Sequence, residues 1–307
     1  MIYTITLNPA VDCTMTVSDY AEGRVNRAES QVLSAGGKGI NMSVILNRLG
    51  IETKALGFCG GDTGQLLCRL LDKAQCPHSM TELDGKLTRI NMKLHAQGTE
   101  TEVNGKGPDI SEQEIEKFTA ELIATVKDGD TVILAGSIPS SVPDTVYSDI
   151  AELFAEKNVR IIADTSGKPL ENILAKKPFL VKPNNFELAE ICQREITTRE
   201  QALSGAQILR EMGAQNVLVS LAGEGAVLVC SDGRQYEIDA PKGEVKNSVG
   251  AGDSMLAGFL AGLELWHDDC KKALILATAC GSATAFSESL AEKEEIMQLY
   301  EKLKGEN

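Results

Sequence analysis

The stretch "NSVGAGDSMLAGFLAGL", residues 247–263, joins a glycine-rich turn to an apolar helix. Gly250, Ala251 and Gly252 directly precede Asp253, and the apolar run follows without a break. Small residues allow a tight turn, and the N–H groups at a helix start have no intrahelical partner. Such N–H groups can hold an anion, and the helix dipole favours an ionised carboxylate at the same end. The pattern predicts a base beside an anion hole, an arrangement that favours group transfer.

Short runs rich in Val, Ile and Leu recur along the rest of the chain. They are apolar on both faces, as are the strands of a covered parallel sheet, and we expect them at residues 2–7, 131–136, 159–164, 179–182 and 216–221. Stretches with helical spacing lie between them, at residues 111–126, 143–158 and 199–213. The alternation predicts an α/β fold, a three-layer sandwich with a mostly parallel central sheet.

The alternation of strands and helices is interrupted in two segments, residues 11–34 and 86–106. In parts of these segments, polar and apolar residues alternate. Half-buried antiparallel strands have this period. We expect the two segments to pair as a small sheet that projects from a single domain of residues 1–307 and acts as a lid. A compact domain with a hairpin ornament is the alternative. A small sheet exposed on both sides would leave open edges, so a homodimer formed through the lid is expected.

Composition narrows the classes of partner. Acidic residues number 44 and basic residues 30, for a formal net charge of −14, and no cluster of Lys and Arg stands out, so a nucleic-acid partner is not expected. The eight cysteines are scattered and form no C-x-x-C pair, which favours free thiols in a reducing cytosol over a zinc site. No apolar run approaches the ~18 residues of a spanning helix, so we expect a cytoplasmic protein without a membrane partner.

Two nucleotide-binding motifs are absent. In "GGKGIN", residues 36–41, Lys38 is followed by Gly39 rather than Ser or Thr, so any use of ATP requires another phosphate cradle. The chain also lacks the G-x-G-x-x-G fingerprint, which argues against a nicotinamide-dependent enzyme.

Asn184 and Glu187 lie three residues apart at an expected helix start. They form either a capping box or a polar pair that orders water around a magnesium–phosphate complex.

Together these motifs resemble the signatures of the PfkB (ribokinase-like) carbohydrate kinase family. The resemblance covers essentially the whole chain and rests on "AGGKGIN" (35–41), "KPNNFE" (182–187) and "VGAGDSMLAGFLAGL" (249–263). The branch of 1-phosphofructokinase and tagatose-6-phosphate kinase is similar at "TLNPAVD" (6–12), "VNR" (25–27), "TRINMKL" (88–94) and "GSIP" (136–139). The "TRIN" form favours the former.

The resemblance implies an α/β sandwich with a β lid and ATP-dependent phosphorylation of a sugar hydroxyl. Fructose 1-phosphate is the expected substrate, and tagatose 6-phosphate is the alternative. A non-catalytic sugar-phosphate sensor is disfavoured by the intact "GAGD" motif, residues 250–253.

The resemblance also implies a role for each matched residue. Asp253 would be the base, and the N–H groups of Gly250, Ala251 and Gly252 would form the anion hole. On the sugar side, hydroxyls would be held by Asp12, Gly37 and Asn41, the existing phosphate by Lys38, Arg89 and Arg27, and Ser137 is a weaker candidate. A phosphate held by both Lys38 and Arg89 would draw the lid onto the core. Some relatives carry a second arginine where this chain has Asn91, which lowers the positive charge expected at the phosphate.

On the nucleotide side, the resemblance implies that Asn184 and Glu187 support Mg²⁺, mainly through water, and that Lys182 lies near the phosphates of ATP. The remaining implied nucleotide residues are Ser220, Gly223 and Gly225 in a flanking loop, and Gly281 and Ser282 on a helix beside the adenine.

Overall fold

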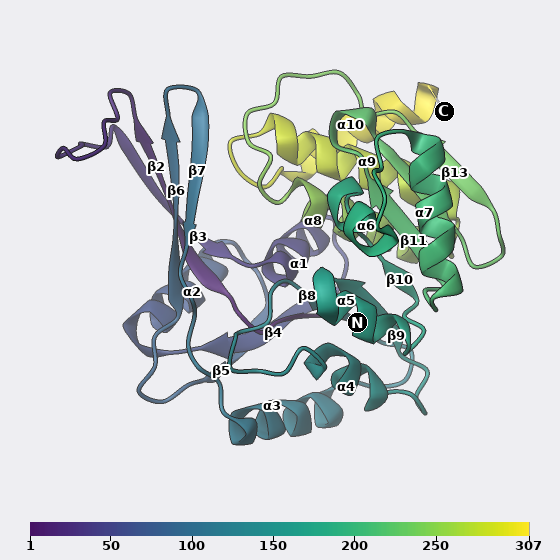
Figure 1. Ribbon diagram of the computed structural model, residues 1–307, viewed down its shortest axis with the longest axis horizontal. Coiled ribbons are helices and arrows are strands. Elements are labelled where there is room, and N and C mark those ends of the chain that lie inside the picture. Colours follow the sequence, from purple (N-terminus) through teal and green to yellow (C-terminus); the bar gives the residue numbers. More distant parts are fainter. Residues whose placement is uncertain (307) are drawn as a thin grey trace.

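The computed structural model describes residues 1–306, which form two β-sheets and the helices that pack on them (Figure 1). The larger sheet has nine strands in the order β13-β12-β11-β10-β9-β8-β1-β4-β5. All neighbours are parallel except β12 and β13, which are antiparallel additions at one edge. The strands are β1 (Ile2–Thr6), β4 (Thr53–Cys59), β5 (His78–Glu82), β8 (Thr131–Ala135), β9 (Arg160–Asp164), β10 (Leu180–Val181), β11 (Asn216–Ser220), β12 (Ala226–Val229) and β13 (Gln235–Ile238).

Helices cover both faces of this sheet. One face packs against α1 (Lys38–Arg48), α8 (Ala251–Leu265), α9 (Cys270–Phe286) and α10 (Lys293–Glu306). The other face packs against α3 (Glu112–Thr125), α4 (Val146–Glu152), α5 (Gly167–Leu174), α6 (Asn185–Cys192) and α7 (Arg199–Glu211). The prediction of a three-layer α/β sandwich is confirmed.

Capping residues explain where several helices begin. Ser111 with Glu114, and Thr198 with Gln201, form complete capping boxes at the starts of α3 and α7. The helix expected over residues 143–158 is shorter than predicted. The helix spans only Val146–Glu152, and after it the N–H groups of Phe154, Ala155 and Lys157 each bond the carbonyl oxygen three residues back, as in a tighter turn.

The second sheet has four strands in the order β3-β2-β6-β7 and projects from the body of the molecule (Figure 1). They are β2 (Ala10–Val17), β3 (Ser30–Gly36), β6 (Arg89–Ala96) and β7 (Thr99–Asn104). β2 and β6 are parallel, and the outer pairs are antiparallel. At the base of this sheet, α2 (Gly61–Lys73) packs against α1 and buries Val11.

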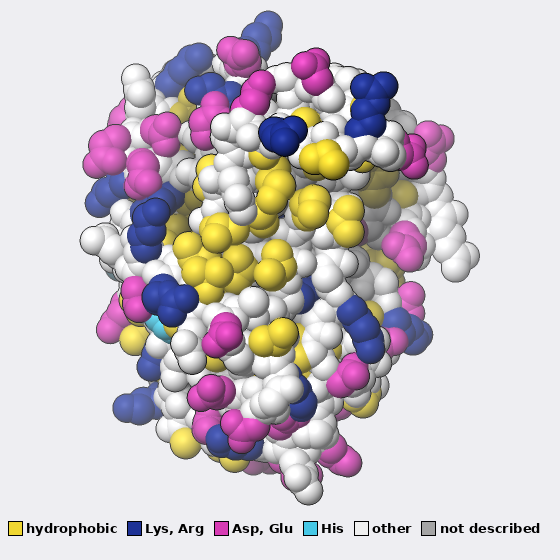
Figure 2. All heavy atoms as spheres, turned by 90° about the vertical axis from the view of Figure 1, so that its left-hand side faces the viewer, with side chains coloured by type: hydrophobic (Ala, Val, Ile, Leu, Met, Phe, Trp, Pro, Cys, Tyr) yellow, Lys and Arg dark blue, Asp and Glu magenta, His cyan; other side chains and the backbone are white. Residues whose placement is uncertain are grey.

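The two faces of the second sheet differ in chemistry. Asp12, Asn91 and Lys93 share the inner face and are each 8% exposed. On the outer face, the register sets Leu33, Cys13, Met92 and Val103 in one row across all four strands. Leu33, Met92 and Val103 are exposed. Figure 2 views the molecule from this side and shows hydrophobic side chains gathered near the middle of that face.

Within residues 1–306, no helix combines the length and the apolar character needed to cross a membrane.

Candidate active site

The start of α8 is a tight turn that glycine makes possible. Gly250 caps the helix with a left-handed backbone (φ 77°), and a Cβ added there would lie 2.7 Å from Leu290 Cδ2. A Cβ at Gly252 would lie 3.4 Å from Lys182 Nζ, so the ammonium group sits directly beside this turn. The N–H groups of Gly252 and Asp253 belong to the first helical turn, which has no intrahelical acceptors. The turn therefore combines backbone donors with a cation.

Asp253, in the first turn of α8, is buried and points toward α1. Its Oδ2 accepts a hydrogen bond of 2.8 Å from Asn41 Nδ2. Burial, helped by the nearby Asp164 carboxylate, raises the pKa of Asp253 to about 6, although Lys38 acts in the opposite direction. A carboxylate with this pKa can take up a proton near neutral pH.

Asp164 was missed by sequence reasoning. It ends β9, is fully buried, and its Oδ1 lies 3.1 Å from Lys38 Nζ and 3.6 Å from Lys182 Nζ. Burial alone would raise the pKa of Asp164, but the ammonium groups of Lys182 and Lys38 lower it below its ordinary value. The Asp164 charge in turn raises the pKa of Lys38. A signal was present, because the acid closes the apolar run "VRIIAD", and the carboxyl ends of parallel strands meet at one edge of a sheet.

Asn184 and Glu187 form a complete capping box at the start of α6. Asn184 Oδ1 accepts from the N–H groups of Phe186 and Glu187, and Glu187 Oε2 accepts from the Asn184 N–H. The other carboxylate oxygen of Glu187 lies 3.8 Å from Lys38 Nζ. Glu187 therefore caps its own helix and also faces the charged cluster of Lys38, Lys182 and Asp164.

The remaining nucleotide-side candidates lie around these elements. Ser220 forms an isolated bridge pair with Asn184. Gly225 has φ 93°, and a Cβ there would overlap the Ile238 carbonyl oxygen. A Cβ at Gly223 would meet no atom within 4 Å.

Gly281 lets α9 pack on the start of α8, since its Cβ would lie 3.1 Å from the Ala251 carbonyl oxygen. The next residue, Ser282, is half-buried.

On the inner face of the four-stranded sheet, Asp12 is held from two directions. Asn91 Nδ2 donates to its Oδ1 at 2.9 Å, and Lys93 Nζ lies 2.8 Å from its Oδ2. A Cβ at Gly36 would lie 2.4 Å from Asp12 Oδ1, so only glycine fits there. Lys93 was not among the residues predicted from the sequence.

Gly37 caps α1 with φ 136°, and a Cβ there would lie 2.8 Å from Thr6 Cγ2. Gly37 therefore places Lys38 and Asn41 in the first turn of α1, where they contact Asp164 and Asp253 respectively.

The cations predicted for the sugar phosphate have different surroundings. Arg89 donates from Nε and Nη2 to the Asn8 carbonyl oxygen, and from Nη1 to the Gly105 carbonyl oxygen. It thereby ties β6 to the loop after β1. Ser137 is exposed and accepts a long hydrogen bond, 3.5 Å, from Asn8 Nδ2. Arg27 is exposed in residues 18–29, the connection between β2 and β3.

A cavity of about 680 Å³ lies between the four-stranded sheet and the core, and its lining includes Asp12, Asn41 and Lys93. Among the described residues, three buried side-chain atoms lack a hydrogen-bond partner: Thr6 Oγ1, Asn8 Oδ1 and Asp164 Oδ2. All three belong to residues at or just beyond the carboxyl ends of β1 and β9. Buried polar atoms are normally paired, so this edge of the sheet suits a polar ligand.

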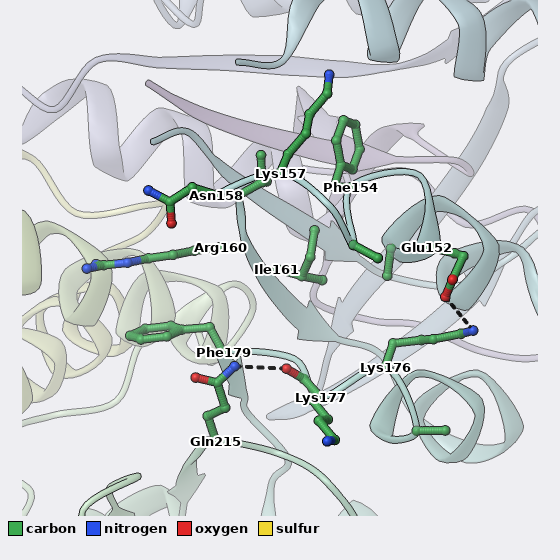
Figure 3. A pocket seen from close by; sticks show the side chains of 14 residues that line it. Glu152, Phe154, Lys157, Asn158, Arg160, Ile161, Lys176, Lys177, Phe179 and Gln215 are labelled. Atoms are coloured by element: carbon green, nitrogen blue, oxygen red, sulfur yellow. Dashed lines mark hydrogen bonds and ion pairs between the residues drawn. The ribbon is translucent and has the colours of Figure 1, made fainter. Parts of the chain in front are cut away.

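A second hollow of about 550 Å³ opens near the starts of β9 and β10 (Figure 3). Two of the cations on its rim already have acidic partners: Lys176 pairs with Glu152, and Arg160 pairs with Asp268. None of the predicted site residues lines this hollow. The convergent acids and lysines thus mark the opposite edge of the sheet.

Comparison with known proteins identifies the family of this chain. The family model described as pfkB family carbohydrate kinase matches residues 5–297. A 1-phosphofructokinase of Bacillus subtilis is 44% identical over 304 residues, 99% of each chain. A tagatose-6-phosphate kinase of Staphylococcus epidermidis is 33% identical over 268 residues, which are 86% of this chain and 85% of that protein. The structure of Escherichia coli phosphofructokinase-2 in complex with fructose-6-phosphate is similar with a TM-score of 0.90, 27% identity and 99% coverage of both chains.

Proposed function

Since the chain belongs to the pfkB family of carbohydrate kinases, we propose that it phosphorylates the 6-hydroxyl of fructose 1-phosphate with ATP, giving fructose 1,6-bisphosphate and ADP. The observation that carries this proposal is the position of Asp253, buried at a glycine-capped helix start beside Lys182 and Lys38. The choice of sugar is supported by the 44% identity to the Bacillus subtilis 1-phosphofructokinase over nearly the full length of both chains.

In the proposed reaction, Asp253 accepts the proton of the sugar 6-hydroxyl as its oxygen attacks the γ-phosphorus of ATP. The bond from this phosphorus to the bridging oxygen breaks, and ADP leaves with that electron pair. The N–H groups of Gly250 and Gly252 and the ammonium group of Lys182 stabilise the negative charge on the transferred group. The Ala251 N–H, also expected in the anion hole, already donates to the Ser248 carbonyl oxygen at 3.2 Å. The pKa of about 6 leaves Asp253 mostly ionised at neutral pH while it can still accept a proton.

The residues present fit a magnesium ion that arrives with the nucleotide. Asp164 has a buried oxygen without a protein partner, and Glu187 directs one oxygen toward the same cluster. No group of three or more His, Cys, Asp or Glu that could hold a metal occurs among residues 1–306, which favours binding through water and the phosphates of ATP. Glu187 and Asn184 would support the ion in this way, and Mg²⁺ would neutralise phosphate charge.

The remaining residues of the nucleotide site flank this cluster. Lys182 would contact the phosphates of ATP. The loop with Ser220, Gly223 and Gly225 would flank the nucleotide, and Gly281 and Ser282 would lie beside the adenine.

The sugar would bind between the four-stranded sheet and α1. Its hydroxyls would meet Asp12, Gly37 and Asn41, and its phosphate would meet Lys38 and Arg89. Since Arg89 already bonds Asn8, closure of the sheet over the sugar would tighten an existing link between lid and core. Ser137 and Arg27 are weaker candidates, because both are exposed and Arg27 lies on the connection between β2 and β3.

The proposed assembly is a homodimer that pairs the outer faces of the two four-stranded sheets. The row of Leu33, Met92 and Val103 on this face supports the assembly, since closed twofold pairing would cover it. A cytoplasmic location is proposed as well, because all eight cysteines are free thiols.

A panel of acceptor sugars, coupled to ADP release, tests the proposed reaction. Fructose 1-phosphate should give the highest kcat/KM, above tagatose 6-phosphate, and both should exceed free fructose. The 33% identity to a tagatose-6-phosphate kinase makes that activity the second candidate. A clear preference for tagatose 6-phosphate would establish the second candidate instead. Equal use of free fructose would contradict the phosphate site.

A further inference from the structure

Lys93 lies in the middle of β6, and its side chain is only 10% exposed. Its Nζ lies 2.8 Å from Asp12 Oδ2. From the same strand, Asn91, the register partner of Asp12, donates to Asp12 Oδ1 at 2.9 Å. Both oxygens of one carboxylate on β2 are therefore held by side chains of β6.

This contact is a largely buried ion pair, which is costly unless the geometry is good and further hydrogen bonds support it. Asn91 supplies such a bond, and the absence of a Cβ at Gly36 leaves room for the Asp12 carboxylate beside β3. An ionised carboxylate has about four acceptor positions, and Asn91 and Lys93 occupy two of them. The remaining acceptor positions stay available in a cavity that Asp12 and Lys93 both line.

Arg89, the other cation of β6, is used differently. Its guanidinium group donates to the Asn8 and Gly105 carbonyl oxygens and is not part of the cavity lining. Lys93 is therefore the basic residue of β6 that meets both the cavity and the acid expected to bind the sugar.

We propose that Lys93 is a positioning residue that determines sugar recognition by holding the Asp12 carboxylate oriented toward two sugar hydroxyls. The inference rests on the proposed function, in which Asp12 accepts hydrogen bonds from the sugar. Lys93 acts through Asp12 and not by contact with the sugar phosphate. Without Lys93, a buried carboxylate loses its counter-charge and turns away from the sugar.

The first test separates sugar binding from turnover in Lys93→Met, which keeps the side-chain length and removes the charge. We expect the KM for the sugar phosphate to rise at least about tenfold, with kcat within about threefold and the KM for ATP unchanged. Lys93→Arg should recover most of the loss, because it restores the charge. Lys106→Met is the matched control, since Lys106 is exposed and forms a local ion pair with Asp109. An unchanged sugar KM in Lys93→Met, or a loss confined to kcat, would overturn the proposal.

A double-mutant cycle with Asp12→Asn tests whether Lys93 acts through Asp12. If it does, Lys93→Met added to Asp12→Asn should change the sugar KM by less than about threefold. If the two effects multiply, Lys93 contacts the sugar on its own, and the proposal is wrong.

Binding without turnover gives an independent readout. Sugar phosphate alone should raise the Tm of the wild type and of Lys93→Arg but not that of Lys93→Met. If Lys93→Met does not fold, the Lys93→Arg result decides: a sugar KM within about threefold of wild type supports the proposal, and a larger rise overturns it. All assays use the sugar phosphate that the wild type prefers in the panel. A preference for tagatose 6-phosphate would therefore overturn the proposed substrate and still leave the coupling of Lys93 to Asp12 measurable.

Discussion

Two buried carboxylates at the same edge of the large sheet have opposite electrostatic environments. Burial raises the pKa of both acids, but at Asp164 the ammonium groups of Lys182 and Lys38 outweigh it and lower the pKa. At Asp253, burial and the Asp164 charge raise the pKa to about 6. When the environments of neighbouring acids move their pKa values apart, their roles separate. Asp164 is suited to remain charged, and Asp253 is suited to exchange a proton.

The first prediction concerns Asp253→Asn, which keeps the shape of the side chain and removes the base. The substitution should lower kcat by roughly 10²- to 10⁴-fold, because proton transfer by a positioned base contributes about this much. Nucleotide binding, measured by calorimetry, should change little. A variant with near-normal turnover would refute the assignment of Asp253 as the base.

The second prediction follows from the pKa of about 6. A base acts when ionised, so kcat/KM should be full well above pH 6 and should fall as the pH drops through it, tending to tenfold per pH unit. Sugar phosphates also titrate near pH 6. The control is therefore the residual activity of Asp253→Asn, which is measured with the same titrating substrate. Its kcat/KM should show only a small part of the fall at low pH. If kcat/KM falls equally at low pH in the wild type and in Asp253→Asn, the titrating group belongs to the substrate and not to Asp253.

At the scale of the elements, the Glu187 carboxylate at the start of α6 makes two different contacts. Glu187 closes the capping box with one oxygen and faces Lys38 with the other. The start of α3 provides a comparison, since Ser111 and Glu114 form the same box without any residue assigned to the active site.

The third prediction uses this pair of capping boxes. Glu187→Gln should raise the Mg²⁺ concentration needed for half-maximal activity by roughly tenfold, because groups that support a bound metal affect its affinity strongly. Gln still fits a capping box, so the free energy of unfolding should fall by less than about 1 kcal/mol. Glu114→Gln should leave the Mg²⁺ requirement unchanged. Lower stability without any change in Mg²⁺ dependence would reduce Glu187 to a capping residue.

Periodicity and caps were enough to predict the layers and five of the nine strands of the large sheet, but not β4, β5, β12 and β13. The apolar runs became strands of the large sheet, and "SEQE" became the observed capping box of α3. The sequence did not predict Asp164 and Lys93 as site residues, because their roles depend on contacts between residues that are far apart in the chain. Asp164 meets Lys38 from 126 positions earlier, and Asn91 and Lys93 meet Asp12 only because β2 pairs with β6. The pairing of these two segments was expected from their alternating pattern, but the pattern does not give the register that sets Asn91 opposite Asp12.

At the scale of the whole molecule, the four-stranded sheet has two surfaces with different requirements. The inner surface carries Asp12, Asn91 and Lys93 and faces the cavity, while the outer surface carries the exposed row of Leu33, Met92 and Val103. In a single chain this apolar row is exposed to water, which is unfavourable because apolar surface favours burial. A second copy of the same sheet would present the same row to it, and twofold symmetry would close the assembly at two chains.

The last prediction tests this assembly. The wild type should scatter light with twice the 32.9 kDa mass of one chain at micromolar concentration. Met92→Glu places a charge in the centre of the row and should shift the protein to monomers, since an unpaired buried charge is costly. Met212→Glu is the matched control: Met212 is 42% exposed, against 44% for Met92, and follows α7 on the body of the molecule. It should stay dimeric. A monomeric wild type, or equal dissociation of both variants, would exclude pairing through this face.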